Sequence, residues 1–202
     1  MTSLAACGGS SSNVDMTPTV PTGANGFQAV QQRGLNLAER FGPAIETSQY
    51  TNLRALPTTG TLNYSGSGAY VLGSAAAQSG SSILANADAI SRVDLQVRLN
   101  DGRVTGSASE FYDTETRAPI GGRLAIRGAL DRTIDTSRDY GINGTINGTL
   151  QSPTDGQVSV QTDMVADLYG PNAGFLFGYA DGFATTAQGR DSVQGAFIAE
   201  RN

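Results

Sequence analysis

The sequence predicts an all-β protein: an eight-stranded antiparallel up-and-down barrel, preceded by a short helix and a disordered N-terminal tether. Three observations predict this architecture. The 202 residues include 26 Gly and only 7% aromatic residues, which favours short strands joined by turns. From residue 58 onward, apolar residues recur at every second position. The eight resulting segments follow one another with short links, and such a meander closes on itself because closure removes unpaired strand edges.

The first part of the chain, residues 1–26, is interpreted as a lipid-attachment remnant and a flexible tether. Its segment GGSSSNVDMTPTVPTGANG (residues 8–26) contains almost nothing that can pack, and Pro18 and Pro21 stiffen its middle. Residues 27–57 are predicted to be a short helical or irregular segment. Apolar residues there recur at loosely helical spacing and Gly34 weakens the middle, so we expect one imperfect helix or two turns beside the core.

Residues 58–202 are predicted to form the barrel domain. In RVDLQVRL, four apolar residues alternate with Asp, Gln and Arg, which indicates a half-buried strand. The following Asn100-Asp101-Gly102 is typical of a hairpin turn. The INGTINGT repeat at residues 142–149 is interpreted as one strand, although each Asn-Gly could instead mark a turn. The eight predicted strands span residues 61–72, 92–99, 102–112, 123–130, 140–150, 157–170, 174–184 and 191–201.

An eight-stranded barrel has an interior just wide enough for side chains to fill it or for one small ligand. The residues assigned to the inner face mix bulky and minimal side chains, as in Tyr64 and Tyr70 beside Gly66 and Gly68. This mixture indicates interlocking side chains rather than an open calyx. Met164 continues the apolar alternation of its strand, so we interpret it as a core residue rather than a haem ligand.

The residues absent from the sequence restrict its chemistry. The chain contains no His, Lys or Trp, which excludes Ser–His and Cys–His pairs, Schiff bases and His-ligated metals. The carboxylate-rich stretches at residues 110–115 and 131–139 lack the spacing of a calcium loop. The net charge of −5 disfavours nucleic acid as a partner. We therefore predict no enzyme, no metal site, no cofactor and no nucleic-acid binding.

The only cysteine, Cys7, follows Leu4-Ala5-Ala6 and precedes a Gly/Ser run. This pattern resembles the bacterial lipobox, which implies lipidation at Cys7 and a membrane partner reached through the lipid. Because Gly8 and not Asp follows the cysteine, the resemblance implies an outer-membrane lipoprotein, on either the cell surface or the periplasmic face. Only three residues precede Leu4, so we expect the native start and signal peptide to lie upstream.

The C-terminal segments carry a second resemblance, in LYGPNA at residues 168–173, Gly178, and GAFIAER at residues 195–201. They resemble the closing strands of the β-barrel domains of transferrin-binding protein B and related bacterial surface lipoproteins. In those domains a YGPxA turn leads into a Gly-rich strand and a final GxF strand that ends in a basic residue. The resemblance implies a β-barrel of a signal-bearing surface lipoprotein.

Together these resemblances imply an outer-membrane lipoprotein that acts as a non-enzymatic binding module, in iron or haem acquisition. A filled barrel has no internal site, so a protein or haem ligand would be bound through the barrel loops. The longest predicted loop spans residues 73–88, and its adjacent Ile83 and Leu84 are the predicted partner-binding residues. Two alternatives stay open: the two side chains could cap one barrel end, and the protein could be a structural envelope lipoprotein with no specific ligand.

Overall fold

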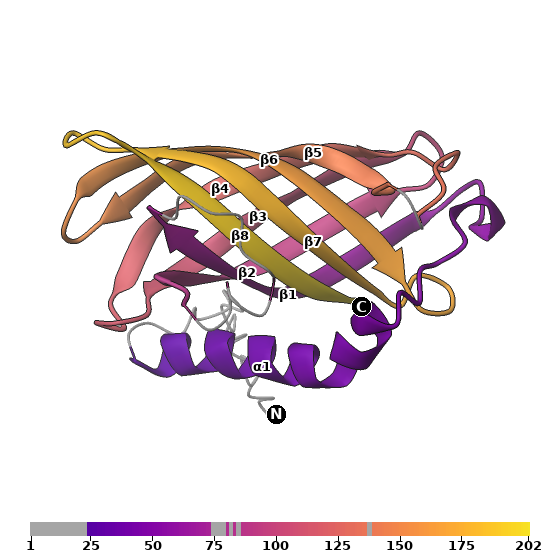
Figure 1. Ribbon diagram of the computed structural model, residues 1–202, viewed down its shortest axis with the longest axis horizontal. Coiled ribbons are helices and arrows are strands. Elements are labelled where there is room, and N and C mark those ends of the chain that lie inside the picture. Colours follow the sequence, from indigo (N-terminus) through magenta and orange to yellow (C-terminus); the bar gives the residue numbers. More distant parts are fainter. Residues whose placement is uncertain (1–23, 74–79, 81–82, 84–85, 137–138) are drawn as a thin grey trace, which may run out of the picture.

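The computed structural model of the protein describes residues 24–73, 80, 83, 86–136 and 139–202. It shows a closed β-barrel with a long helix along its outer wall (Figure 1). The predicted eight-stranded antiparallel barrel is therefore confirmed. The elements are α1 (Ala24–Glu46), the 3-10 helix η1 (Leu53–Ala55), β1 (Thr61–Leu72), β2 (Ala89–Arg98), β3 (Arg103–Asp113), β4 (Pro119–Leu130), β5 (Ile142–Ser152), β6 (Gly156–Tyr169), β7 (Phe175–Thr185) and β8 (Arg190–Arg201).

Each strand pairs with its neighbours in sequence, and β1 pairs with β8 to close the barrel. The INGT repeat lies within the single strand β5, as predicted. The turn between β2 and β3 places Gly102 at a φ of 70°, where glycine is favoured. Register shifts interrupt the β2–β3 and β3–β4 ladders, and such bulges help a sheet to bend into a barrel.

The barrel interior holds one apolar core. Tyr64, Met164 and Phe197 are each at most 2% exposed, and all three belong to the same cluster of buried side chains. The Tyr70 and Phe111 rings lie 5.6 Å apart in this cluster. The predicted assignment of Met164 to the core agrees with this position. Burial of the Tyr70 hydroxyl raises its pKa to about 12, so this group stays neutral near pH 7.

The outer wall of the barrel has two different faces. Over β4, β5 and β6 it presents exposed polar and charged side chains, namely Arg123, Arg127, Asn143, Asn147, Gln161 and Asp163. Over β1 and β8 it is apolar, and Ala69, Val71 and Ala196 are buried there. An apolar interior with a polar outer face is the reverse of the pattern in transmembrane barrels. Among the described residues, no helix has the length and apolarity needed to cross a membrane.

Helix α1 runs along the outer wall of the barrel, in contact with β1, β2 and β8 (Figure 1). It is one continuous helix of 23 residues that begins at Ala24, so residues 24–26, assigned to the tether from sequence, are helical. Phe27, Val30 and Leu37 are buried against the barrel. Gly34 lies inside this continuous helix and faces Ser67 of β1. A Cβ at that position would lie 3.3 Å from the Cβ of Ser67.

Candidate functional site

The candidate site lies at one end of the barrel, which we call the linker end. It is formed by the β2–β3, β4–β5 and β6–β7 connections together with the linker of residues 47–60, and it lies on the right in Figure 1. Leu53 and Leu56 of the linker are buried and belong to the barrel core. The Arg132 guanidinium donates hydrogen bonds to the carbonyl oxygens of Leu53, Leu56 and Pro57. The linker therefore closes this end of the barrel.

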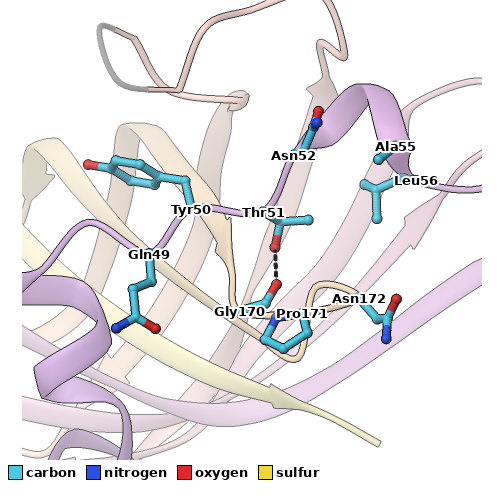
Figure 2. A pocket seen from close by; sticks show the side chains of 9 residues that line it. All are labelled: Gln49, Tyr50, Thr51, Asn52, Ala55, Leu56, Gly170, Pro171 and Asn172. Carbon is cyan, nitrogen blue, oxygen red and sulfur yellow. Dashed lines mark hydrogen bonds between the residues drawn. The ribbon is translucent and has the colours of Figure 1, made fainter.

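The linker is joined to the β6–β7 turn by main-chain hydrogen bonds. The Thr51 N–H donates to the Leu168 carbonyl at 2.8 Å, and the Gly170 N–H donates to the Gln49 carbonyl at 2.9 Å. Tyr50 thus forms an antiparallel bridge with Tyr169. The Thr51 hydroxyl also donates to the Gly170 carbonyl at 2.8 Å, as Figure 2 shows. Residues 49–51 act as a short strand added to the end of β6.

The β6–β7 turn is held by two strands that are distant in sequence. Its Asn172 and Ala173 adopt φ angles of 58° and 55°. The buried Tyr64 hydroxyl of β1 donates to the Ala173 carbonyl at 2.9 Å. The Arg201 guanidinium at the end of β8 donates to the Asn172 carbonyl. The Tyr-Gly-Pro-Asn-Ala turn and the final basic residue, noted separately in the sequence, therefore form one structural unit.

A stack of four aromatic rings runs from α1 to the linker. The Phe41 and Phe175 rings lie 4.1 Å apart and are stacked, and Phe175 stacks on Tyr169 at 5.1 Å. Tyr169 then lies 5.0 Å from Tyr50. Burial raises the pKa of the Tyr169 hydroxyl, and its interaction with Tyr50 raises it further. The stack gives the linker end a rigid, neutral aromatic support.

Two hollows open at the linker end, and the linker segment 50–52 lines both of them. The first has a volume of about 380 Å³ and lies between the linker and the β6–β7 turn (Figure 2). The second has a volume of about 480 Å³ and lies between the linker and the β4–β5 loop. The second is lined by Tyr50, Thr51, Asn52, Leu53, Arg54, Ile134, Asp135 and Thr136. Both hollows are open at the surface, which suits contact with a partner molecule.

A buried carboxylate anchors the β4–β5 loop beside these hollows. Asp167 of β6 is 2% exposed, and its Oδ1 accepts a hydrogen bond from the Gly141 N–H at 2.8 Å. Burial raises the pKa of Asp167 to about 6, the charge of Asp139 adds to this rise, and the hydrogen bond from Gly141 opposes it. An unfolded aspartate has a pKa of about 3.9. The folded state therefore holds this proton up to a higher pH, and stability falls as the pH rises from about 4 to 6.

The residues predicted from the sequence to bind a lipid or a partner lie elsewhere. Cys7 and Leu84 are outside the described residues. Ile83 is 2% exposed and packs with Ala69, Val71 and Ala196 on the outer wall of the barrel. In this position it does not cap a barrel end, and it offers a partner almost no contact area. A binding role for Ile83 and Leu84 stays a prediction.

Two carboxylates of these acidic stretches, Asp113 and Asp131, accept hydrogen bonds within their own turns. Asp113 accepts hydrogen bonds from Thr116, and Asp131 accepts them from Thr133, which lowers the pKa of each carboxyl group. In the part of the chain that the structure describes, no group of three or more His, Cys, Asp or Glu side chains could hold a metal ion.

Sequence reasoning missed both the linker and Asp167. In the sequence, LRAL (residues 53–56) is too short to show a helical period, so nothing distinguishes the linker from an irregular segment. Asp167 was not singled out, since it stands in DMVADLYG as an ordinary polar residue of an alternating strand. The available signal is the spacing of Tyr50, Leu53 and Leu56 between the polar segments TSQ (47–49) and PTTG (57–60), which indicates a segment with apolar anchors.

The chain forms a closed, apolar-filled barrel whose hollows lie at the surface, and this architecture occurs in a known family of β-barrel domains. The family model described as "C-lobe and N-lobe beta barrels of Tf-binding protein B" matches residues 56–201. The chain therefore belongs to this family. No curated protein matches the chain.

Solved structures of transferrin-binding protein B are similar over the barrel. A mutant from Haemophilus parasuis Hp5 is 18% identical with a TM-score of 0.48, and the match covers 75% of this chain and 28% of that one. Intact Ap-TbpB with its N and C lobes is 17% identical with a TM-score of 0.49, covering 75% and 28%. The Neisseria meningitidis serogroup B protein is 14% identical with a TM-score of 0.46, covering 76% and 27%. The match thus covers less than a third of each of these three proteins.

Proposed function

We propose that this protein is an outer-membrane lipoprotein, anchored through Cys7, whose barrel binds a ligand at the linker end. The ligand is a protein or haem, and the process is iron or haem acquisition. The observation that carries the proposal is the linker end itself. The linker and the β4–β5 and β6–β7 connections line two open hollows there, on a frame of hydrogen bonds and stacked rings. Rigid loops on a stable scaffold are the usual place for recognition.

Membership of the family supports a role in binding rather than catalysis. The polar outer wall over β4, β5 and β6 supports a barrel that stands in water rather than in lipid. The lipobox-like sequence before Cys7 supports the anchor. Transferrin is the first protein ligand to test, because it is named in the description of the family.

The anchor is tested with the native gene expressed from its upstream start. Labelling with palmitate and recovery in the outer-membrane fraction are expected for the wild type, and Cys7→Ser is expected to lose both. Labelling that persists in this variant would refute the lipid attachment at Cys7.

Ligand binding is tested with immobilised protein and two probes, transferrin and haem. Arg54 is exposed and lines the larger hollow, whereas Arg123 is exposed on the polar outer wall. We expect Arg54→Ala to weaken binding of the probe and Arg123→Ala to leave it unchanged. If neither probe binds the wild type, the acquisition role is refuted. The alternative, a structural envelope lipoprotein with no specific ligand, then explains the protein better.

A further inference from the structure

The linker presents a short, unpaired strand edge. In residues 49–51 the Thr51 N–H and the Gln49 carbonyl face β6, because they form the hydrogen bonds of the added strand. Since strand residues alternate in direction, the main-chain groups of Tyr50 and Asn52 face away from β6. The Tyr50 N–H donates to Ser48, and the Asn52 carbonyl accepts from Ala55. Among the described residues, the Tyr50 carbonyl and the Asn52 N–H form no main-chain hydrogen bond.

These two groups have the spacing that an antiparallel strand requires. In an antiparallel ladder, the N–H of residue i+1 and the carbonyl of residue i−1 bond to the partner strand across residue i. Here residue i is Thr51, with the Asn52 N–H on one side and the Tyr50 carbonyl on the other. Everywhere else the barrel is closed, so β1 to β8 leave no unpaired long edge.

The hollow of about 480 Å³ lies beside the same linker residues, and it is open to solvent. Its walls are the linker on one side and residues 134–136 of the β4–β5 loop on the other. Leu53 and Ile134 contribute apolar surface to this lining, and the half-buried Tyr50 adds an aromatic ring. Arg54, Asp135 and Thr136 also line the hollow, so this lining suits an extended main chain whose side chain has both polar and apolar atoms.

We propose that the edge formed by the Tyr50 carbonyl and the Asn52 N–H receives an extended peptide segment of a protein partner by strand addition. The proposal rests on the proposed function in placing the partner at the linker end, and it adds the mode of recognition. The peptide pairs antiparallel to the linker across Thr51, and one of its side chains enters the hollow. Main-chain hydrogen bonds supply binding, and the hollow selects the side chain.

The backbone of Asn52 permits a test that removes a single donor. Asn52 has a φ of −69°, which proline adopts without strain, and the N–H of the preceding Thr51 forms one of the hydrogen bonds of the Tyr50–Tyr169 bridge. Asn52→Pro therefore removes the N–H while keeping the backbone path. It also removes the side chain, which accepts a hydrogen bond from the Arg54 N–H at 3.2 Å. Asn52→Ala is the matched control, because it loses the same side chain but keeps the N–H.

The probe is a phage-displayed library of random dodecapeptides, selected on the full chain and followed by affinity measurements with the selected synthetic peptides. We expect Asn52→Pro to bind these peptides about tenfold or more weakly than Asn52→Ala, because an acceptor on the peptide is left unpaired. In the wild type, peptide addition is expected to slow hydrogen exchange of the Asn52 amide.

Failure to select any peptide, or equal affinity in the two variants, would overturn the proposal. Dimerisation of the wild type that Asn52→Pro abolishes would assign the edge to a second copy of the chain and would equally overturn it. These outcomes are separate from the test of the proposed function. If peptides bind at this edge but neither transferrin nor haem binds the protein, the acquisition role is rejected and the strand-addition proposal stands.

Discussion

Replacing Gly66 by alanine is expected to destabilise the barrel at the seam between β1 and β8. Gly66 pairs with Ala199 there, and a Cβ on Gly66 would lie 1.9 Å from the Ile198 carbonyl oxygen and 2.5 Å from the Ala199 Cα. A carbon and a carbonyl oxygen normally approach to about 3.3 Å, so the strands would have to separate locally by roughly 1.4 Å. Such overpacking costs on the order of 1 to 3 kcal/mol.

The assay is urea unfolding of the Gly66→Ala variant followed by circular dichroism. A loss of about 2 kcal/mol lowers the midpoint by about 1 M urea for a domain of this size. Gly121→Ala is the matched control, since Gly121 is an exposed strand glycine whose Cβ would make only an ordinary contact, 3.4 Å from the Gln151 Cβ. We expect this control to match or slightly exceed the wild type. Equal midpoints for Gly66→Ala and the wild type would refute the close packing of the seam.

Three further changes test the linker end and the outer wall. Asp167→Asn is expected to have the same unfolding free energy as the wild type near pH 4 and a higher one, by about 1 to 3 kcal/mol, above pH 7. Urea midpoints of both proteins measured across this pH range check this. A difference in midpoint that does not change with pH would contradict it. Arg132→Ala frees three linker carbonyls, so we expect faster proteolysis within residues 47–57 and a loss of about 1 to 3 kcal/mol. Ile83→Ala is expected to cost about 2 to 5 kcal/mol in thermal or urea unfolding, and a neutral result would mean that Ile83 does not pack as described.

The barrel could be predicted from the sequence because each strand shows the alternation that one apolar face requires. In β2, Val93, Leu95 and Val97 are buried and the residues between them are not. Local turn signals, such as Asn100-Asp101-Gly102, then set the connections. These signals are short-range, so a single sequence contains them.

The linker end could not be predicted, because its contacts join segments that are far apart in the chain. Arg132 and the linker carbonyls are more than 70 residues apart, as are Tyr64 and the Ala173 carbonyl. The length of α1 was underestimated for a similar reason. Its Gly34 looks unfavourable in isolation, and only the approach of Ser67 on the barrel explains a residue without a side chain there.

The pairing of β1 with β8 also has a kinetic consequence. This ladder joins Tyr64 to Arg201, so closure must wait until the whole intervening chain is present, and contacts of such long sequence separation slow folding. Until then β1 and β7 each carry an open edge that can pair with another chain. Helix α1 bridges the seam, because Arg33 donates to the Ser65 carbonyl of β1 and Arg40 forms an ion pair with Glu200 of β8 at 2.5 Å. Because α1 contacts both strands of this ladder, separating β1 from β8 also requires breaking one of these two contacts of the helix.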